Sequence, residues 1–203
     1  MMISSIAIFQ IIVLIFSAII HEYMHGWMAE RLGDSTAKEA GRLTLNPLPH
    51  IDLFGSILLP FILIMTGSHF VFGWAKPVPF NPYNLRDQKY GAAKVAAAGP
   101  LGNLITALFF GAILRFFPLN SPTLVLALQL IVFINLLLMV FNLVPIPPLD
   151  GSKIILPFLP RRWQLNYLKV EQYGMFLVVI FIVLGFSLII PIVEFLFNLI
   201  VGG

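Results

Sequence analysis

Five long apolar stretches, separated by short polar segments, dominate the chain. A helix needs about 20 apolar residues to cross about 30 Å of hydrocarbon, and each stretch approaches or exceeds that length. The pattern therefore predicts helices embedded in a membrane. Gly185 and Pro191 interrupt the last stretch, which predicts a kink in that helix. The five stretches are residues 3–20, 53–72, 92–117, 123–144 and 175–201.

Composition supports the same interpretation. Of the 203 residues, 59% are hydrophobic and 10% are charged, and the mean hydropathy is +0.96. A soluble domain has roughly 45–50% apolar and about 25% charged residues. We therefore expect one membrane-embedded domain over residues 1–203. Residues 3–20 have no basic segment before them and no small-residue cleavage site after them, so we expect a retained span.

The positions of the basic residues predict how the chain crosses the membrane. If all five stretches crossed, basic loops would lie on both sides, although Lys and Arg favour the cytoplasmic side. If residues 53–72 enter and leave on the same side, eleven of the twelve basic residues share the cytoplasmic side and only Arg115 lies opposite. We therefore predict an all-α polytopic protein of the cell membrane with about four transmembrane helices and a re-entrant segment.

The segments that flank this re-entrant stretch have a strand-like pattern. Residues 42–46 alternate between polar and apolar side chains, and residues 70–80 contain Pro77 and Pro79. Pro60 near the middle of residues 53–72 fits a broken helix better than a straight span. We therefore predict a short β-hairpin between the first two spans, packed against protein or a water-filled cavity.

A metal-binding pattern follows the first apolar stretch directly. His21-Glu22-Tyr23-Met24-His25 is an HExxH sequence, which on a helix places both imidazoles on one face. They can share one Zn²⁺, and Glu22 can take a proton from a zinc-bound water. Such short motifs also occur by chance on solvated helices. In a membrane helix, however, each ionisable residue costs about 2.5–3.5 kcal/mol, and a metal would compensate for that cost.

A catalytic zinc site needs a third protein ligand, and the chain has no cysteine to provide it. Asp150 is the best candidate because it follows a membrane helix that Pro145, Pro147 and Pro148 bring to an end. The alternative role for Asp150 is a helix cap or an interfacial charge. His50 and His69 flank the re-entrant stretch, and neither is assigned to the metal. We expect one zinc ion per chain.

Three motifs in order resemble those of the site-2 protease family of intramembrane zinc metalloproteases. They are the HExxH sequence, residues 98–103 (Ala-Gly-Pro-Leu-Gly-Asn), and residues 142–151, which run from Asn142 through Asp150 to a glycine. Residues 41–48 and 72–79 resemble the small bacterial and archaeal branch of this family. Larger members carry a PDZ domain between the spans that here are separated only by residues 118–122, where no domain fits.

The resemblance implies a role for each matching residue. His21, His25 and Asp150 would bind zinc, and Glu22 would act first as the general base and then as the acid that protonates the leaving amine. Asn103 and Asn142 would lie near the zinc and hold the substrate backbone or a developing oxyanion. Asn103 could instead join two helices, as polar residues in membranes often do. The resemblance also implies an active site toward the cytoplasmic face.

These observations together predict an intramembrane zinc metalloprotease. Its substrate would be a transmembrane protein or peptide that is cleaved in or near its membrane segment, and we expect the lipid bilayer, not nucleic acid, as its environment. The alternative is a non-proteolytic zinc-binding membrane protein or a transporter. A transporter should have ligands along a path to both faces, whereas the ionisable residues here cluster near one face.

Overall fold

The computed structural model describes residues 5–58, 61–62, 65 and 76–202. Within this part, four helical spans are long and apolar enough to cross a membrane, as predicted. Three are single helices and the fourth is a continuous run of three elements. They are α1 (Ser5–Arg31), α4 (Gly91–Phe116), α5 (Pro122–Leu143), and α8 (Gly174–Ile180) with the π-helix η5 (Phe181–Gly185) and α9 (Phe186–Val201).

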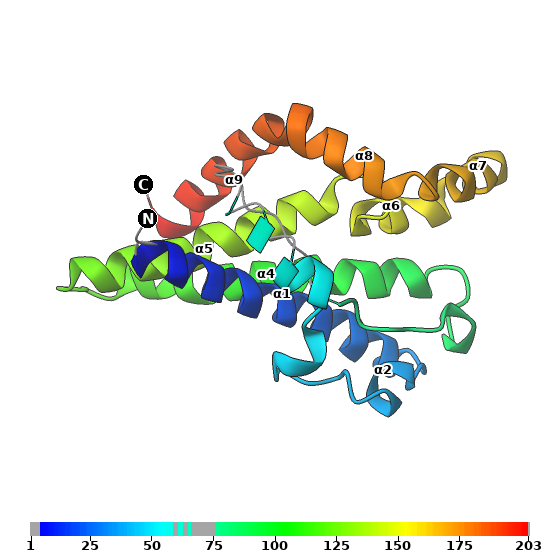
Figure 1. Cartoon of the computed structure of the whole chain (residues 1–203), viewed down its shortest axis with the longest axis horizontal. Helices are drawn as coiled ribbons and strands as arrows, with labels where there is room; N and C mark the ends of the chain where they lie inside the picture. Colours follow the sequence, from blue (N-terminus) through cyan, green and yellow to red (C-terminus); the bar gives the residue numbers. More distant parts are fainter. Residues whose placement is uncertain (1–4, 59–60, 63–64, 66–75, 203) are drawn as a thin grey trace.

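Helix α4 packs against both α1 and α5, and α9 packs on α5 (Figure 1). Small residues on α4 allow the close approach to α1, because a Cβ at Gly102 would lie 2.5 Å from the Met24 Cγ. The apolar core between α4, α5 and α9 contains Val132, Leu136 and Val193. The last span bends between α8 and α9, where η5 interrupts the α-helix (Figure 1).

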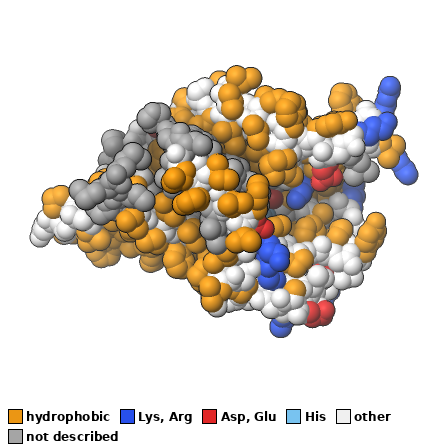
Figure 2. Space-filling view, in the orientation of Figure 1, with side chains coloured by type: hydrophobic (Ala, Val, Ile, Leu, Met, Phe, Trp, Pro, Cys, Tyr) orange, Lys and Arg blue, Asp and Glu red, His pale blue; other side chains and the backbone are white. Residues whose placement is uncertain are grey.

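The surface of the bundle is apolar over the long helices, and on the face seen in Figure 2 the charges lie toward one end. Large side chains such as Phe109, Leu188 and Phe195 are exposed on the outer faces of α4 and α9. In Figure 2, hydrophobic side chains extend along the length of the visible face, whereas the charged side chains lie in its right-hand half. Because exposed apolar helix faces of this extent suit lipid, the chain is a multi-pass membrane protein.

Short elements and irregular backbone connect the long helices. Between α1 and α4 lie the helix α2 (Thr36–Glu39), the 3-10 helices η1 (Leu48–His50) and η3 (Pro82–Asn84), and the π-helix η2 (Leu53–Leu58). Between α5 and α8 lie the helix α6 (Asp150–Ile155), the 3-10 helix η4 (Leu156–Phe158) and the helix α7 (Arg161–Glu171).

The predicted β-hairpin does not form in the residues that the structure describes. Residues 43–45 form bends, and residues 42, 46 and 76–80 are irregular. Side chains take the hydrogen bonds that a strand would use, since Thr44 Oγ1 accepts from the Asn46 N–H and Asn46 Oδ1 accepts from the Leu48 N–H. Pro77 and Pro79 have no N–H to donate. Residues 70–75 lie outside the described part.

The predicted re-entry of residues 53–72 stays a prediction. Its first six residues form the π-helix η2, and most of the remainder lies outside the described residues. The stretch is not among the four spans found in the described part of the chain.

A buried carboxylate holds the two ends of the α1–α4 connection together. Asp34 has 0% exposure, and its oxygens accept hydrogen bonds from the Asn81 N–H, the Asn84 side-chain amide and Thr36. Burial raises the pKa of Asp34, but the hydrogen bonds from Thr36, Asn84 and Asn81 outweigh it and leave the pKa below its ordinary value. The ionised carboxylate therefore stabilises this connection.

We expect Asp34→Asn to loosen residues 76–84. A carboxylate whose pKa is lowered by folding stabilises the folded state above its unfolded pKa of about 3.9 and loses this effect as the pH falls toward the folded value. At pH 7 the variant should exchange the Asn81 amide hydrogen about tenfold faster or more, because a charge-assisted hydrogen bond is lost. Hydrogen exchange followed by mass spectrometry measures this rate.

The matched control is Glu30→Gln, which removes an exposed ion pair with Lys38 in the same region. Such pairs contribute little to stability, so exchange at Asn81 should stay close to wild type. Equal exchange in wild type and Asp34→Asn at pH 7 would contradict the stabilising role of Asp34.

Candidate metal centre

Helix α1 presents two histidines one turn apart with their rings facing the same point. The His21 and His25 rings have centroids 4.6 Å apart, and their Nε2 atoms are separated by 3.0 Å. Asp150 Oδ2 lies 3.0 Å from His21 Nε2 and 3.2 Å from His25 Nε2. His21 and Asp150 are buried and His25 is partly buried. The structure thus brings together the three residues predicted as ligands.

The turn that follows α5 places Asp150 beside the two histidines. The chain leaves α5 after Leu143, passes the prolines and starts α6 at Asp150. Gly151 is required there, because a Cβ would lie 2.7 Å from the Val144 carbonyl oxygen and would also collide with the Leu143 carbonyl. This close approach folds α6 back against the end of α5, and α6 in turn packs on α4.

Helix α4 orients both imidazoles from the other side. Val95, Gly99 and Asn103 are spaced four apart and therefore share one face of α4. The Val95 carbonyl lies 2.7 Å from His25 Nδ1, and Asn103 Oδ1 lies 2.7 Å from His21 Nδ1. A Cβ at Gly99 would lie 2.5 Å from His25 Nε2, so only glycine leaves space for the rings.

The donor atoms suit a zinc ion. A carbonyl oxygen can only accept, so His25 carries its proton on Nδ1, and Nε2 is left with a lone pair. The Nε2 atoms of both histidines and Asp150 Oδ2 lie within 3.2 Å of one another, an arrangement that a cation between them would stabilise. Two ligands of a tetrahedral zinc at about 2.0–2.1 Å are about 3.3 Å apart, close to these separations. Two imidazoles and a carboxylate leave a fourth position for water.

Glu22 stands beside this group and does not belong to it. It is partly buried, and its Oε2 accepts a hydrogen bond of 2.8 Å from the Val78 N–H. Val78 sits against α1 at Gly26, where a Cβ would lie 2.9 Å from the Val78 Cγ1. The segment before η3 therefore holds the carboxylate of Glu22 from outside α1.

The two candidate asparagines have different surroundings. Asn103 is fully buried and contacts His21 directly. Asn142 donates its side-chain amide to the Leu138 carbonyl of its own helix, 2.9 Å away. His50 is buried, and its Nε2 bonds to the Thr44 carbonyl, away from the centre. His69 lies outside the described residues.

Sequence reasoning missed Ser17, Asn135 and the Val95 carbonyl, which support the two histidines. Asn135 is a polar residue in the middle of an apolar stretch, which was a usable signal. Ser17 precedes His21 by four residues and so shares its helix face. The Val95 carbonyl carries no side-chain signal, because any residue at that position would present it.

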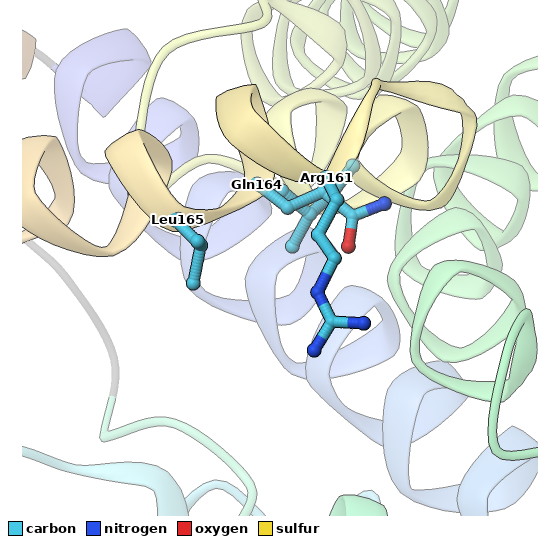
Figure 3. Close-up of a pocket in the computed structure, with 4 residues that line it drawn as sticks. Arg161, Gln164 and Leu165 are labelled. Carbon is cyan, nitrogen blue, oxygen red and sulfur yellow. The ribbon is translucent and has the colours of Figure 1, made fainter.

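A separate cavity of about 480 Å³ opens beside η4 and α7. It is lined by Leu156, Arg161, Gln164 and Leu165, and Figure 3 shows the Arg161 side chain extending away from the helix. None of the metal-centre residues lines it. It is therefore a feature distinct from the centre at His21.

A helical membrane bundle with a His–His–Asp centre defines a membrane protein with a candidate catalytic metal site. The family model of peptidase family M50 matches residues 119–185, which include Asp150. "Putative zinc metalloprotease YwhC" of Bacillus subtilis is 36% identical over 196 residues, covering 92% of this chain and 86% of the relative. This chain therefore belongs to peptidase family M50 and is a metalloprotease of the site-2 type, so the predicted family is confirmed.

Two further relatives carry the same description. "Putative zinc metalloprotease Rip2" of Mycolicibacterium smegmatis is 30% identical over 168 residues, covering 82% of this chain and 63% of that protein. "Putative zinc metalloprotease MJ0611" of Methanocaldococcus jannaschii is 30% identical over 164 residues, covering 78% of this chain and 74% of that protein. No solved structure matches the chain.

Substitution of Gly99 tests the geometry of the centre. We expect Gly99→Ala to weaken zinc binding by about 10–100-fold, the range seen when the support of a metal ligand is disturbed, because the new Cβ displaces both rings. Titration of the purified protein against a competing chelator measures the affinity. Gly111→Ala is the matched control, since it crowds α4 against Ile200 instead, and it should keep the wild-type affinity. Unchanged binding by a folded Gly99→Ala would contradict the predicted ligand set.

Proposed function

We propose that this chain is an intramembrane zinc metalloprotease that hydrolyses peptide bonds in or near transmembrane segments of membrane proteins. The convergence of His21, His25 and Asp150 on helices of membrane-spanning length carries this proposal. Both histidines belong to α1, and the groups that orient them belong to α4. A metal centre built on these helices lies within the membrane-spanning part of the chain, which suits a substrate that is itself embedded in the membrane.

In this proposal His21, His25 and Asp150 hold one zinc ion per chain. When bound, the ion supplies Lewis-acid chemistry, which acidifies water and polarises a peptide carbonyl. The Glu22 carboxylate takes a proton from the attacking water and returns it to the leaving amine. The hydrogen bond from the Val78 N–H supports this role, because it holds the carboxylate in place beside the ligands.

The asparagines take separate roles. The Asn103 amide is engaged by protein groups on both its oxygen and its nitrogen. Asn142 lies in the last turn of α5, shortly before Asp150 in the chain. We therefore keep Asn142 as the candidate for holding the substrate backbone or the developing oxyanion.

We further propose that the active site faces the cytoplasmic side of the cell membrane. This orientation would place eleven of the twelve basic residues on the cytoplasmic side, which Lys and Arg favour. It requires residues 53–72 to enter the membrane and return.

A helical substrate hides its carbonyls in backbone hydrogen bonds, so it must unwind locally before it is cleaved.

No observation favours the alternative of a non-proteolytic zinc-binding protein or transporter. Within the described residues, His21, His25 and Asp150 form the only group of three or more side chains that could hold a metal ion. A carrier would need further sites along its path to the other face. Glu22 would also have no role in a purely structural zinc site.

Replacement of the proposed base separates catalysis from metal binding. Glu22→Gln should lower cleavage of a transmembrane reporter about 100-fold or more, because general-base catalysis contributes roughly 10²–10⁴-fold. Zinc content should stay at one ion per chain, since Glu22 is not a ligand. Glu30→Gln, at a partly exposed position on the same helix, should cleave at the wild-type rate. Wild-type cleavage by Glu22→Gln would rule out this mechanism.

The topology can be tested with single cysteines, because the chain has none of its own. Tyr83 is 85% exposed and follows the proposed re-entrant stretch, so Tyr83→Cys should react with an impermeant maleimide only after the cells are opened. Asn120→Cys, between α4 and α5, should react in intact cells. Labelling of Tyr83→Cys in intact cells would contradict the proposed topology.

A further inference from the structure

A chain of buried polar side chains runs through the bundle and ends on His21. It joins α1, α4 and α5 through Ser17, Asn103 and Asn135, which are 3%, 0% and 0% exposed. Asn103 Nδ2 donates to the Ser17 carbonyl and to Asn135 Oδ1, each at 3.0 Å. Asn135 Nδ2 donates to Ser17 Oγ and to the Ile131 carbonyl, each at 2.9 Å.

Two backbone carbonyls determine which groups donate and which accept in this chain of polar side chains. The Ile131 carbonyl can only accept, so it fixes the NH₂ group of Asn135 on its side and turns Oδ1 toward Asn103. The Ser17 carbonyl likewise fixes the NH₂ group of Asn103. Asn103 Oδ1 must then face His21 Nδ1, 2.7 Å away, and only a protonated Nδ1 can donate to it. The neutral imidazole therefore has its lone pair on Nε2, the atom next to Asp150.

We propose that Asn103 is a positioning residue, which with Asn135 and Ser17 sets the ring orientation and the tautomer of His21 for metal binding. This inference rests on the proposed zinc site and deepens it. It replaces the substrate role that the sequence suggested for Asn103. Both amide hydrogens of Asn103 are bonded to buried groups, so Asn103 has no donor left to offer a substrate carbonyl or an oxyanion.

A role as simple glue between helices does not account for the arrangement. Two asparagines in an apolar bundle are costly unless their polar groups are all bonded. One amide-to-carbonyl bond would suffice to join two helices. Here every amide hydrogen of Asn103 and Asn135 is used, which leaves a single arrangement, and that arrangement ends on a predicted ligand. Partners of this kind orient metal-bound histidines in general.

The test compares zinc affinities of the purified full chain by competition with a chelator. Asn103→Leu should bind zinc about 10–100-fold more weakly than wild type. Asn135→Leu should weaken zinc binding less, because Asn135 reaches His21 only through Asn103. Asn103 keeps its hydrogen bond to the Ser17 carbonyl in this variant. Thr106→Val is the matched control on α4, because it removes a hydrogen bond to the helix's own Gly102 carbonyl, and its affinity should match wild type.

A spectroscopic readout separates positioning from general stability. In ¹⁵N-histidine NMR spectra of the zinc-loaded protein, His21 should show a protonated Nδ1 whose hydrogen exchanges slowly, and this protection should be lost in Asn103→Leu. Wild-type affinity and protection in a folded Asn103→Leu, or in Asn135→Leu if Asn103→Leu does not fold, would overturn the inference. An equal loss in Thr106→Val would overturn it too. Absence of zinc binding by wild type would instead overturn the proposed metal centre itself.

Discussion

The close contact between α1 and α4 is the interaction on which the metal centre depends. Gly99 and Gly102 let the two backbones approach until the His21 and His25 rings lie directly against α4. The same approach brings the Val95 carbonyl and Asn103 within hydrogen-bond distance of the two Nδ1 atoms. A side chain at Gly99 would collide with both rings, and one at Gly102 would collide with Met24 on α1, the helix that carries both rings. Packing and metal-ligand geometry are therefore one constraint in this protein.

The apolar surroundings impose a second constraint, because each polar group inside the bundle needs a partner. Ser17, Asn103 and Asn135 meet this need with one another and with backbone carbonyls. Asp34 meets it outside the bundle with the backbone and side chains of the α1–α4 connection. In a medium of low polarity such hydrogen bonds are strong, and an unpaired group is costly. Full pairing thus selects one arrangement of side chains at the centre.

The connection between α1 and α4 shows where the sequence pattern misled. Alternation in residues 42–46 predicted a strand, but Thr44 and Asn46 capture neighbouring N–H groups and Arg42 binds the carbonyls of Lys76 and Pro77. Alternation reports which side chains share a face, and it does not report whether a partner strand will have free N–H groups to offer. The same connection places Val78 on the carboxylate of Glu22.

The sequence by itself determined the four spans, the HExxH face of α1 and the candidacy of Asp150. These follow from apolar length, from the 3.6-residue helical period and from prolines that end a helix, all of which are local properties. The approach of Asp150 to both histidines, the support from Val95, and the chain from Ser17 through Asn135 to Asn103 were decided only by tertiary structure. These contacts join residues that are 32 to 129 positions apart, and they depend on how closely helices pack, which no local pattern encodes.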